Sequence, residues 1–193
     1  AGGALIFDLT QDPMNPVHVG TYNQRYVHDG FVRNDTFWAA EIEDGIFSVV
    51  DVSDKSNPTV MATQTTPSNY THNLWLSKDG NTLFTTDERP DAYIASYDVS
   101  QLNNITELDR YQSSPGDNVI VHNTFVIDSF LITSYYRDGV VVNDASRPGN
   151  LVETANFDTS PFSSDGFNGC WGEYTYLPSG IVLANDIEEG VVD

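Results

Sequence analysis

A β-rich run that ends in aspartate recurs along the chain and constrains its fold more than any other feature. The four runs are Leu5-Ile6-Phe7-Asp8, Ser48-Val49-Val50-Asp51, Ala95-Ser96-Tyr97-Asp98 and Val141-Val142-Asn143-Asp144. Successive aspartates are 43, 47 and 46 residues apart, and a fifth run, Gly190-Val191-Val192-Asp193, begins where the next is due. Repetition at this period indicates stacked copies of one supersecondary unit.

Each unit contains four short strands. A strand is expected after the aspartate turn at 17–22, 59–64 and 151–157, because Asn and Pro at that turn reverse the chain. A second hairpin accompanies each unit, with strand pairs at 26–32 and 36–42, 71–76 and 82–86, 119–127 and 130–135, and 170–177 and 181–185. The residues between them, such as Asn34-Asp35, are typical of hairpin turns. Residues 100–108 are expected to form at most one helical turn within a loop.

Four strands in about 46 residues match the size of one propeller blade. The sequence therefore predicts an all-β chain, a β-propeller of four-stranded blades with about four blades present, as a single domain over residues 1–193. A β-sandwich also has many short strands, but it lacks a regular repeat of this length. Because the terminal strands would be free edges, we expect a larger propeller or closure by another chain.

The charge of the chain is strongly acidic, with 28 Asp and Glu against 8 Lys and Arg and a net charge of −20. Such a surface repels phosphate backbones, so nucleic acid is not an expected partner, and it attracts cations where carboxylates converge. A single cysteine, Cys170, excludes an internal disulfide. No stretch approaches the ~20 apolar residues of a transmembrane helix, so no membrane-spanning segment is expected.

Three of the four histidines recur at one position of the repeat. They are His28, His72 and His122, with Trp171 at that position in the fourth unit and Glu41, Asp87, Tyr135 and Asp186 near the end of each partner strand. The members of each pair are 13, 15, 13 and 15 residues apart, with a hairpin turn midway. Residues equidistant from such a turn lie opposite each other. We therefore expect four cross-strand pairs at one rim of the central funnel.

This ring of side chains has three interpretations. A ligand-binding rim would comprise His28, Glu41, His72, Asp87, His122, Tyr135, Arg137, Trp171 and Asp186, with Asp29, Asn73, Asn123, Glu43, Glu88 and Glu188 near enough to contribute. Its aromatic groups suit a sugar or peptide. A metal site would use His28, Glu41, His72 and Asp87 to hold a divalent cation, either zinc or calcium. In the structural interpretation, each histidine only holds the carboxylate on the neighbouring strand.

Other residues of the repeat have structural interpretations. Asp51, Asp98 and Asp144 are expected to cap the blade turns, and Asp44-Gly45, Asp138-Gly139 and Glu189-Gly190 are expected to form turns. Cys170 has no sequence neighbour that would lower its thiol pKa, which favours an unreactive thiol. The sequence contains no Gly-rich phosphate loop, G-x-S-x-G or H-E-x-x-H motif, so no catalytic residue is assigned.

The repeat unit, with its V-V-D-V-S run and trailing Asn-Pro, resembles that of the LVIVD-repeat proteins. Among these it is similar to the choice-of-anchor B family of secreted β-propellers. The residues that carry the resemblance are 48–58, 70–72, 85–88, 121–123, 135–139 and 184–190. The resemblance implies export and attachment to the cell surface, with no established activity.

These features favour an exported or cell-surface propeller that acts as a binding or structural module without catalysis. Its partner would be an unknown protein or carbohydrate. The first alternative is a metal-dependent hydrolase or lyase that uses the ring of histidines and carboxylates at the funnel. The second alternative is a subunit of an extracellular filament or surface assembly, with self-association through the terminal strands.

Overall fold

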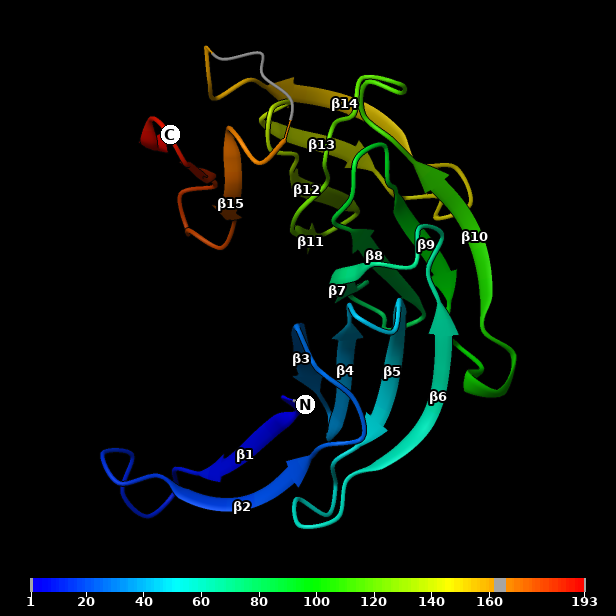
Figure 1. Cartoon of the computed structure of the whole chain (residues 1–193), viewed down its shortest axis with the longest axis vertical. Coiled ribbons are helices and arrows are strands. Elements are labelled where there is room, and N and C mark those ends of the chain that lie inside the picture. The colour runs from blue at the N-terminus through cyan, green and yellow to red at the C-terminus, as the bar shows by residue number, and fades with distance from the viewer. Residues whose placement is uncertain (1, 162–165, 193) are drawn as a thin grey trace.

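The computed structural model describes residues 2–161 and 166–192, which form antiparallel sheets arranged in an arc (Figure 1). Blade 1 comprises β3 (Asp29–Arg33), β4 (Thr36–Glu41), β5 (Ile46–Asp51) and β6 (Thr59–Thr65). Blade 2 comprises β7 (Thr71–Leu76), β8 (Thr82–Asp87), β9 (Ile94–Asp98) and β10 (Thr106–Tyr111). Blade 3 comprises β11 (Thr124–Ile127), β12 (Phe130–Ser134), β13 (Val140–Asp144) and β14 (Val152–Phe157).

Two smaller sheets flank these blades. β1 (Ala4–Asp8) pairs with β2 (Val17–Tyr22), and β15 (Cys170–Tyr174), β16 (Leu183–Asp186) and β17 (Gly190–Val192) form blade 4. Asp193, which ends the fifth predicted run, lies outside the described residues. The predicted all-β fold of four-stranded repeats is confirmed.

Each four-stranded sheet is a meander in which strand order follows the sequence. The first strands β3, β7, β11 and β15 lie along the concave edge of the arc (Figure 1), which we call the channel wall. Neighbouring blades meet through these strands, because β7 contacts β3 and β4, β11 contacts β7 and β8, and β15 contacts β12. Residues at one repeat position are therefore brought side by side at the channel wall.

The hydrophobic core lies between the blades. Trp38, Phe47, Leu74, Leu83 and Tyr97 belong to one buried cluster that joins blades 1 and 2. An equivalent cluster joins blades 2 and 3 through Phe84, Ile94, Val121, Leu131 and Tyr135. Every residue of β8 is buried, since the sheet is covered on both faces. Burial of both faces fixes each blade against the next.

The strand ends differ from the sequence prediction in a few places. The inner strand of blade 3 begins at Thr124 and not at 119. Before it, Ile120 forms an isolated bridge with Pro90, and the His122 N–H still donates to the Ser134 carbonyl at 3.0 Å. No bounds were predicted for outer strand β10, and the helical turn expected within residues 100–108 is η1 (Leu102–Asn104). The inner strand of blade 4 ends at Tyr174, three residues earlier than expected.

The repeated aspartates cap their turns as predicted. Asp51, Asp98 and Asp144 each accept a hydrogen bond on Oδ1 from the backbone N–H two residues later, at 2.8, 2.9 and 2.8 Å. Hydrogen bonds from the side chain and the backbone N–H of the serine at that position lower the pKa of all three carboxyl groups. Gly45, Gly139 and Gly190 have φ values of 65°, 74° and 84°, so the predicted Asp-Gly and Glu-Gly turns are present.

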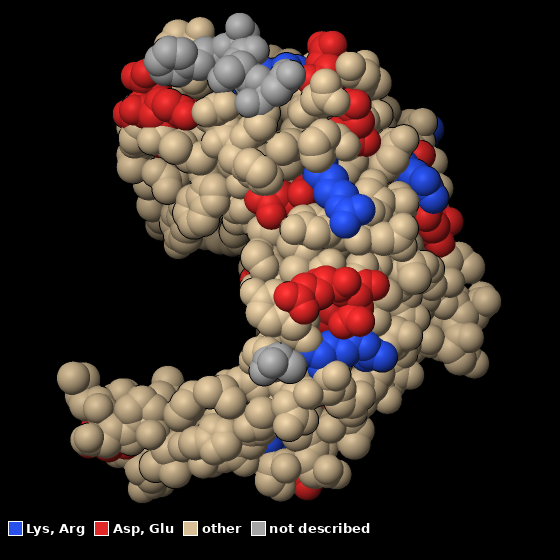
Figure 2. Space-filling view, viewed as in Figure 1, with Lys and Arg blue, Asp and Glu red and all other residues tan. Residues whose placement is uncertain are grey.

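Acidic side chains form separate groups on the face drawn in Figure 2, with basic side chains beside some of them. The same view shows the hollow of the arc on one side. No helix among the described residues has the length and apolar character needed to cross a membrane.

Candidate functional site

The three recurring histidines form a row of rings along the channel wall. The ring centroids of His28 and His72 are 4.5 Å apart, and those of His72 and His122 are 4.3 Å apart. Trp171 continues the row at 5.3 Å from His122. Each ring comes from the start of the inner strand of a different blade, so the stacking of blades brings them together. We call His28, His72, His122 and Trp171 the histidine row.

The carboxylate of Glu88 faces the histidine row. Its Oε2 lies 3.6 Å from Nε2 of His72, and its Oε1 lies 3.6 Å from Nε2 of His122. The hydroxyl of Tyr136 donates a hydrogen bond of 2.7 Å to the same Oε1. The sequence placed Glu88 only among possible contributors and missed Tyr136. A carboxylate oriented by a tyrosine thus lies between imidazoles of two blades.

Burial controls the charge of this cluster. Burial lowers the pKa of His72 to about 3, helped by the neighbouring His122 and His28, and lowers the pKa of His122 to about 4. Burial also raises the pKa of Glu88. Both imidazoles are therefore neutral at pH 7, and their buried Nδ1 atoms have no hydrogen-bond partner. Neutral imidazole is the form that binds a metal ion or accepts a proton.

The histidine row opens into a cavity of about 390 Å³ lined by His28, Asp29, His72, Glu88, His122, Asn123 and Trp171. Asn73 fixes the wall, since its amide donates to Asp29 Oδ2 at 2.7 Å and accepts from the Thr124 N–H at 3.0 Å. One potential ligand atom from each of His28, His72 and Glu88 lies within 4.8 Å of the others. This set of donors can hold a divalent cation.

Glu41 and Asp87, expected as partners of His28 and His72, bind other groups. Glu41 accepts hydrogen bonds from Tyr22 at 2.5 Å and Ser48 at 2.7 Å, and Arg25 lies 3.5 Å away. Asp87 accepts three hydrogen bonds from the segment before its blade, given by Thr66 Oγ1 at 2.5 Å, Ser68 N at 2.7 Å and Tyr70 N at 3.2 Å. The expected carboxylate ligands are therefore turned toward structural partners.

Tyr135 and Asp186 have the same structural role in their blades. The Tyr135 hydroxyl accepts from Ser113 N at 3.3 Å, and Asp186 accepts from Thr159 Oγ1 at 2.7 Å. All four side chains thus anchor the segment that enters the blade. The residues one position later, Glu88 and Tyr136, face the histidine row instead, and Tyr136 does so from a turn in which its φ is 39°. The carboxylates of Glu41 and Asp87, expected opposite His28 and His72, are thus held by other groups, whereas Glu88 of blade 2 approaches His72.

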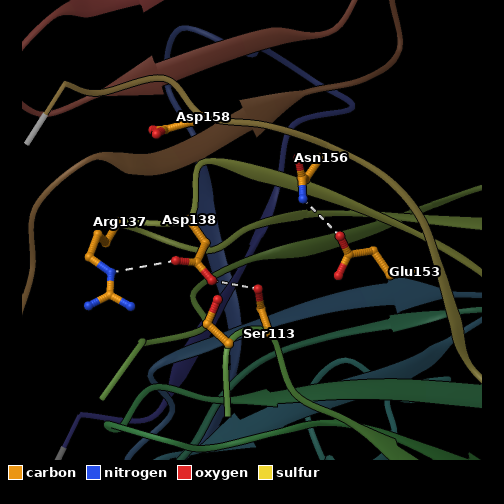
Figure 3. Close-up of a pocket in the computed structure, with 7 residues that line it drawn as sticks. Ser113, Arg137, Asp138, Glu153, Asn156 and Asp158 are labelled. Carbon is orange, nitrogen blue, oxygen red and sulfur yellow. Dashed lines mark hydrogen bonds and ion pairs between the residues drawn. The ribbon is translucent and has the colours of Figure 1, made fainter. Parts of the chain in front are cut away.

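Arg137, another residue expected at the rim, lines a different cavity of about 390 Å³ (Figure 3). Its Nε lies 3.5 Å from Asp138, which accepts a hydrogen bond of 2.5 Å from Ser113. Asn156 donates to Glu153 at 2.9 Å in the same cavity. The charged groups drawn in Figure 3 are thus largely paired with one another. Glu188, also expected near the rim, accepts a hydrogen bond of 2.8 Å from the Gly169 N–H.

Cys170 is buried beside the histidine row's tryptophan, and burial raises its thiol pKa to about 12. An unreactive thiol was expected, and this environment agrees with it.

Comparison with known proteins gives a result only at the level of structure. No protein-family model and no curated protein sequence matches the chain. A periplasmic gluconolactonase from Pseudomonas aeruginosa superposes with a TM-score of 0.74 and 12% identity, over 95% of this chain and 56% of that one. A protein assigned as a 6-phosphogluconolactonase from Bacteroides uniformis superposes with a TM-score of 0.72 and 14% identity, over 98% of this chain and 62% of that one.

A β-propeller domain from Myceliophteria thermophila is also similar, with a TM-score of 0.66 and 10% identity over 98% of this chain and 62% of that one. At these identities the likeness establishes the fold, and the chain has the architecture of β-propeller blades. The chain spans 56% to 62% of the length of the similar structures.

These comparisons correct the functional expectation. The sequence favoured a binding or structural module without catalysis, but two of the structures that share the fold are lactone hydrolases by name. The hydrolase alternative is therefore better supported than the non-catalytic main interpretation.

Proposed function

We propose that this chain is part of a propeller hydrolase that opens a cyclic ester, or lactone, at the histidine row and Glu88. The observation that carries the proposal is the approach of Glu88 to His72 and His122 at 3.6 Å on each side. Both distances are too long for hydrogen bonds. Two ligands bound to one zinc ion at about 2.1 Å each in tetrahedral geometry are roughly 3.4 Å apart, so the spacing of Glu88 and His72 suits a shared cation.

His28, His72 and Glu88 would hold the cation, and His122 would face the other oxygen of Glu88. A divalent cation supplies a Lewis acid and lowers the pKa of bound water. Tyr136 keeps the carboxylate oriented through its 2.7 Å hydrogen bond. The neutral imidazole of His122 accepts the proton of the attacking water. The oxygen of that water bonds to the lactone carbonyl carbon, the ring C–O bond breaks, and the released alkoxide takes the proton, which gives a hydroxy acid.

The test is hydrolysis of 1,5-gluconolactone by the purified protein, followed as acid release, with metal content measured on the same sample. We expect stoichiometric zinc, which imidazole ligands favour, and a rate above the spontaneous reaction that falls on chelation. Glu88→Gln should abolish the increase, while Arg110→Gln on outer strand β10 should not change it. A chelated protein with full activity would exclude the metal, and a Glu88→Gln variant with full activity would exclude the site.

We also propose that the protein is exported. The periplasmic origin of one similar structure, the net charge of −20 and the sequence resemblance to secreted LVIVD-repeat propellers support this location. Fractionation of the native source should find the protein outside the cytoplasmic fraction, and its recovery with cytoplasmic markers would contradict export.

A further inference from the structure

A second row of aromatic rings lines the channel wall at the end away from the histidines. Phe31, Trp75 and Phe125 each follow the histidine of their own inner strand by three residues, which places them nearer the hairpin turns. Phe31 and Trp75 are stacked at 4.9 Å, and Phe125 meets Trp75 edge to face at 4.8 Å. Tyr176 lies 6.3 Å from Trp75 and 5.9 Å from Phe125.

A cavity of about 460 Å³ lies beside this aromatic row. Trp75 and Tyr176 line it together with Arg33, Lys78 and Asp128, which come from the hairpin-turn ends of blades 1 to 3. Tyr176 is 44% exposed, so part of its ring surface is available to a ligand. The cavity thus combines aromatic surface with two of the chain's eight basic residues.

Arg33 is a fixed cation without a carboxylate partner. Its guanidinium donates to the backbone carbonyls of Ser77 at 2.6 Å and Leu76 at 3.4 Å, and it lies 5.7 Å from the centroid of Phe31. Within residues 2–161 and 166–192 no carboxylate reaches ion-pair distance of it. In a chain with 28 acidic residues, a held arginine whose charge is not neutralised is available to an anion.

Lys78 adds a second, movable positive charge. Its Nζ lies 3.7 Å from Asp128, but the two side chains are 85% and 81% exposed. An exposed pair of this kind contributes little to stability, because water screens it. A ligand anion can therefore displace Asp128 from Lys78.

We propose that this cavity binds a carboxylate attached to a ring, either a sugar acid or an aromatic acid. The carboxylate meets Arg33 in the two-pronged geometry that guanidinium favours, and Lys78 approaches from the rim. The ring lies against Tyr176 and Trp75, which offer apolar faces. This site is separate from the histidine row, and the proposal does not depend on lactone hydrolysis.

The test follows the indole N–H resonance of Trp75, assigned with Trp75→Phe, while D-glucuronate, benzoate or D-glucose is added. We expect at least one acid to shift this resonance in a saturable way, more weakly at high salt, and glucose to leave it unchanged. The acid that binds more tightly shows whether the cavity prefers a sugar ring or an aromatic ring. The proposal is overturned if neither acid shifts the resonance, or if glucose shifts it as strongly.

Variants assign the charge that binds the carboxylate. Arg33→Gln should weaken acid binding roughly tenfold or more, because a charge-assisted hydrogen-bond pair is lost. The affinity of Arg33→Lys for the acid should lie between those of the unmodified protein and Arg33→Gln. Lys78→Gln, at an exposed position, should weaken acid binding a few-fold with an unchanged melting temperature. Arg110→Gln is the matched control and should bind normally. Unchanged affinity in both Arg33→Lys and Lys78→Gln would overturn the site even if Arg33→Gln did not fold.

Discussion

The Oε1 atom of Glu88 lies 3.6 Å from Nε2 of His122, across the boundary between blades 2 and 3. The other oxygen of this carboxylate makes the same approach to His72 within blade 2. One side chain thus faces imidazoles of two blades. A substitution of Glu88 therefore tests the chemistry of the site without disrupting the fold of either blade.

Replacement of Glu88 by Gln keeps the side-chain volume and removes the charge. We expect zinc binding to weaken by about 100-fold, since a ligand to the metal is lost. The melting temperature of the metal-free protein should not fall, because Gln keeps the side-chain size and burial disfavours the charge that is removed. Zinc titration calorimetry measures the effect. Glu43→Gln, at an exposed position of blade 1, serves as the control, and equal zinc affinity in the two variants would contradict the assignment.

The buried histidines should make stability fall in mild acid. Their pKa values of about 3 for His72 and about 4 for His122 lie below the unfolded value near 6.5. Below pH 6.5 the unfolded chain therefore binds more protons, so the free energy of unfolding is highest above that pH and decreases down to about pH 4. At pH 5 each histidine accounts for a loss of about 2 kcal/mol.

Denaturant unfolding at pH 7 and pH 5 checks this effect. The double variant His72→Gln/His122→Gln should lose clearly less stability between these pH values than the unmodified protein does. Raised pKa values of Glu88 and Asp87 act in the opposite direction, but they are common to both proteins. An equal loss in the two proteins would mean that these imidazoles are protonated in the folded state.

Asp87 should be important for stability rather than for chemistry. Asp87→Ala leaves the backbone N–H groups of Ser68 and Tyr70 without their acceptor and removes one of the partners of Thr66 Oγ1, which should cost about 3 kcal/mol. Hydrogen exchange at these two amides should accelerate. Asp98→Ala removes one exposed turn hydrogen bond, from Ser100, and should cost no more than about 1 kcal/mol. Comparable losses in the two variants would refute the anchoring role of Asp87.

Two glycines with similar backbone angles should respond differently to alanine. Gly45 and Gly80 have φ values of 65° and 79°, so both substitutions carry a backbone cost. A Cβ on Gly45 would lie 2.6 Å from the Cα of Asn69, whereas one on Gly80 meets nothing within 4 Å. Gly45→Ala should therefore be less stable than Gly80→Ala by about 2 kcal/mol in urea unfolding. Equal midpoints would show that the segment around Asn69 moves away without cost.

The fold was predictable because the repeat marks it directly. Asp51, Asp98 and Asp144 recur where each third strand ends, since each must accept a backbone N–H at the turn. Strand limits were less predictable. The inner strand of blade 3 starts later than expected, because Ile120 pairs with Pro90 of blade 2, and sequence periodicity does not record contacts between blades.

The histidine row was predictable in position but not in partners. Equal distance from the turn places His28 opposite Glu41, consistent with the pairing of Asp29 and Ala40. A bulge in blade 2 instead brings Thr71 opposite Asp87. Backbone register also does not determine the direction in which a carboxylate points. Asp87 points toward the three hydrogen-bond donors in the segment before β7. The expected LVIVD resemblance remains a prediction.

Every ring of the histidine row belongs to a different blade, so no single blade contains the site. A slight rotation of one blade against its neighbour would separate the imidazoles while every hairpin kept its own hydrogen bonds. Metal affinity should therefore report the alignment of blades, and mild denaturant should release the metal before circular dichroism detects a loss of strands. Substitutions in the core between blades could then switch the site off from a distance, with no change to any ligand.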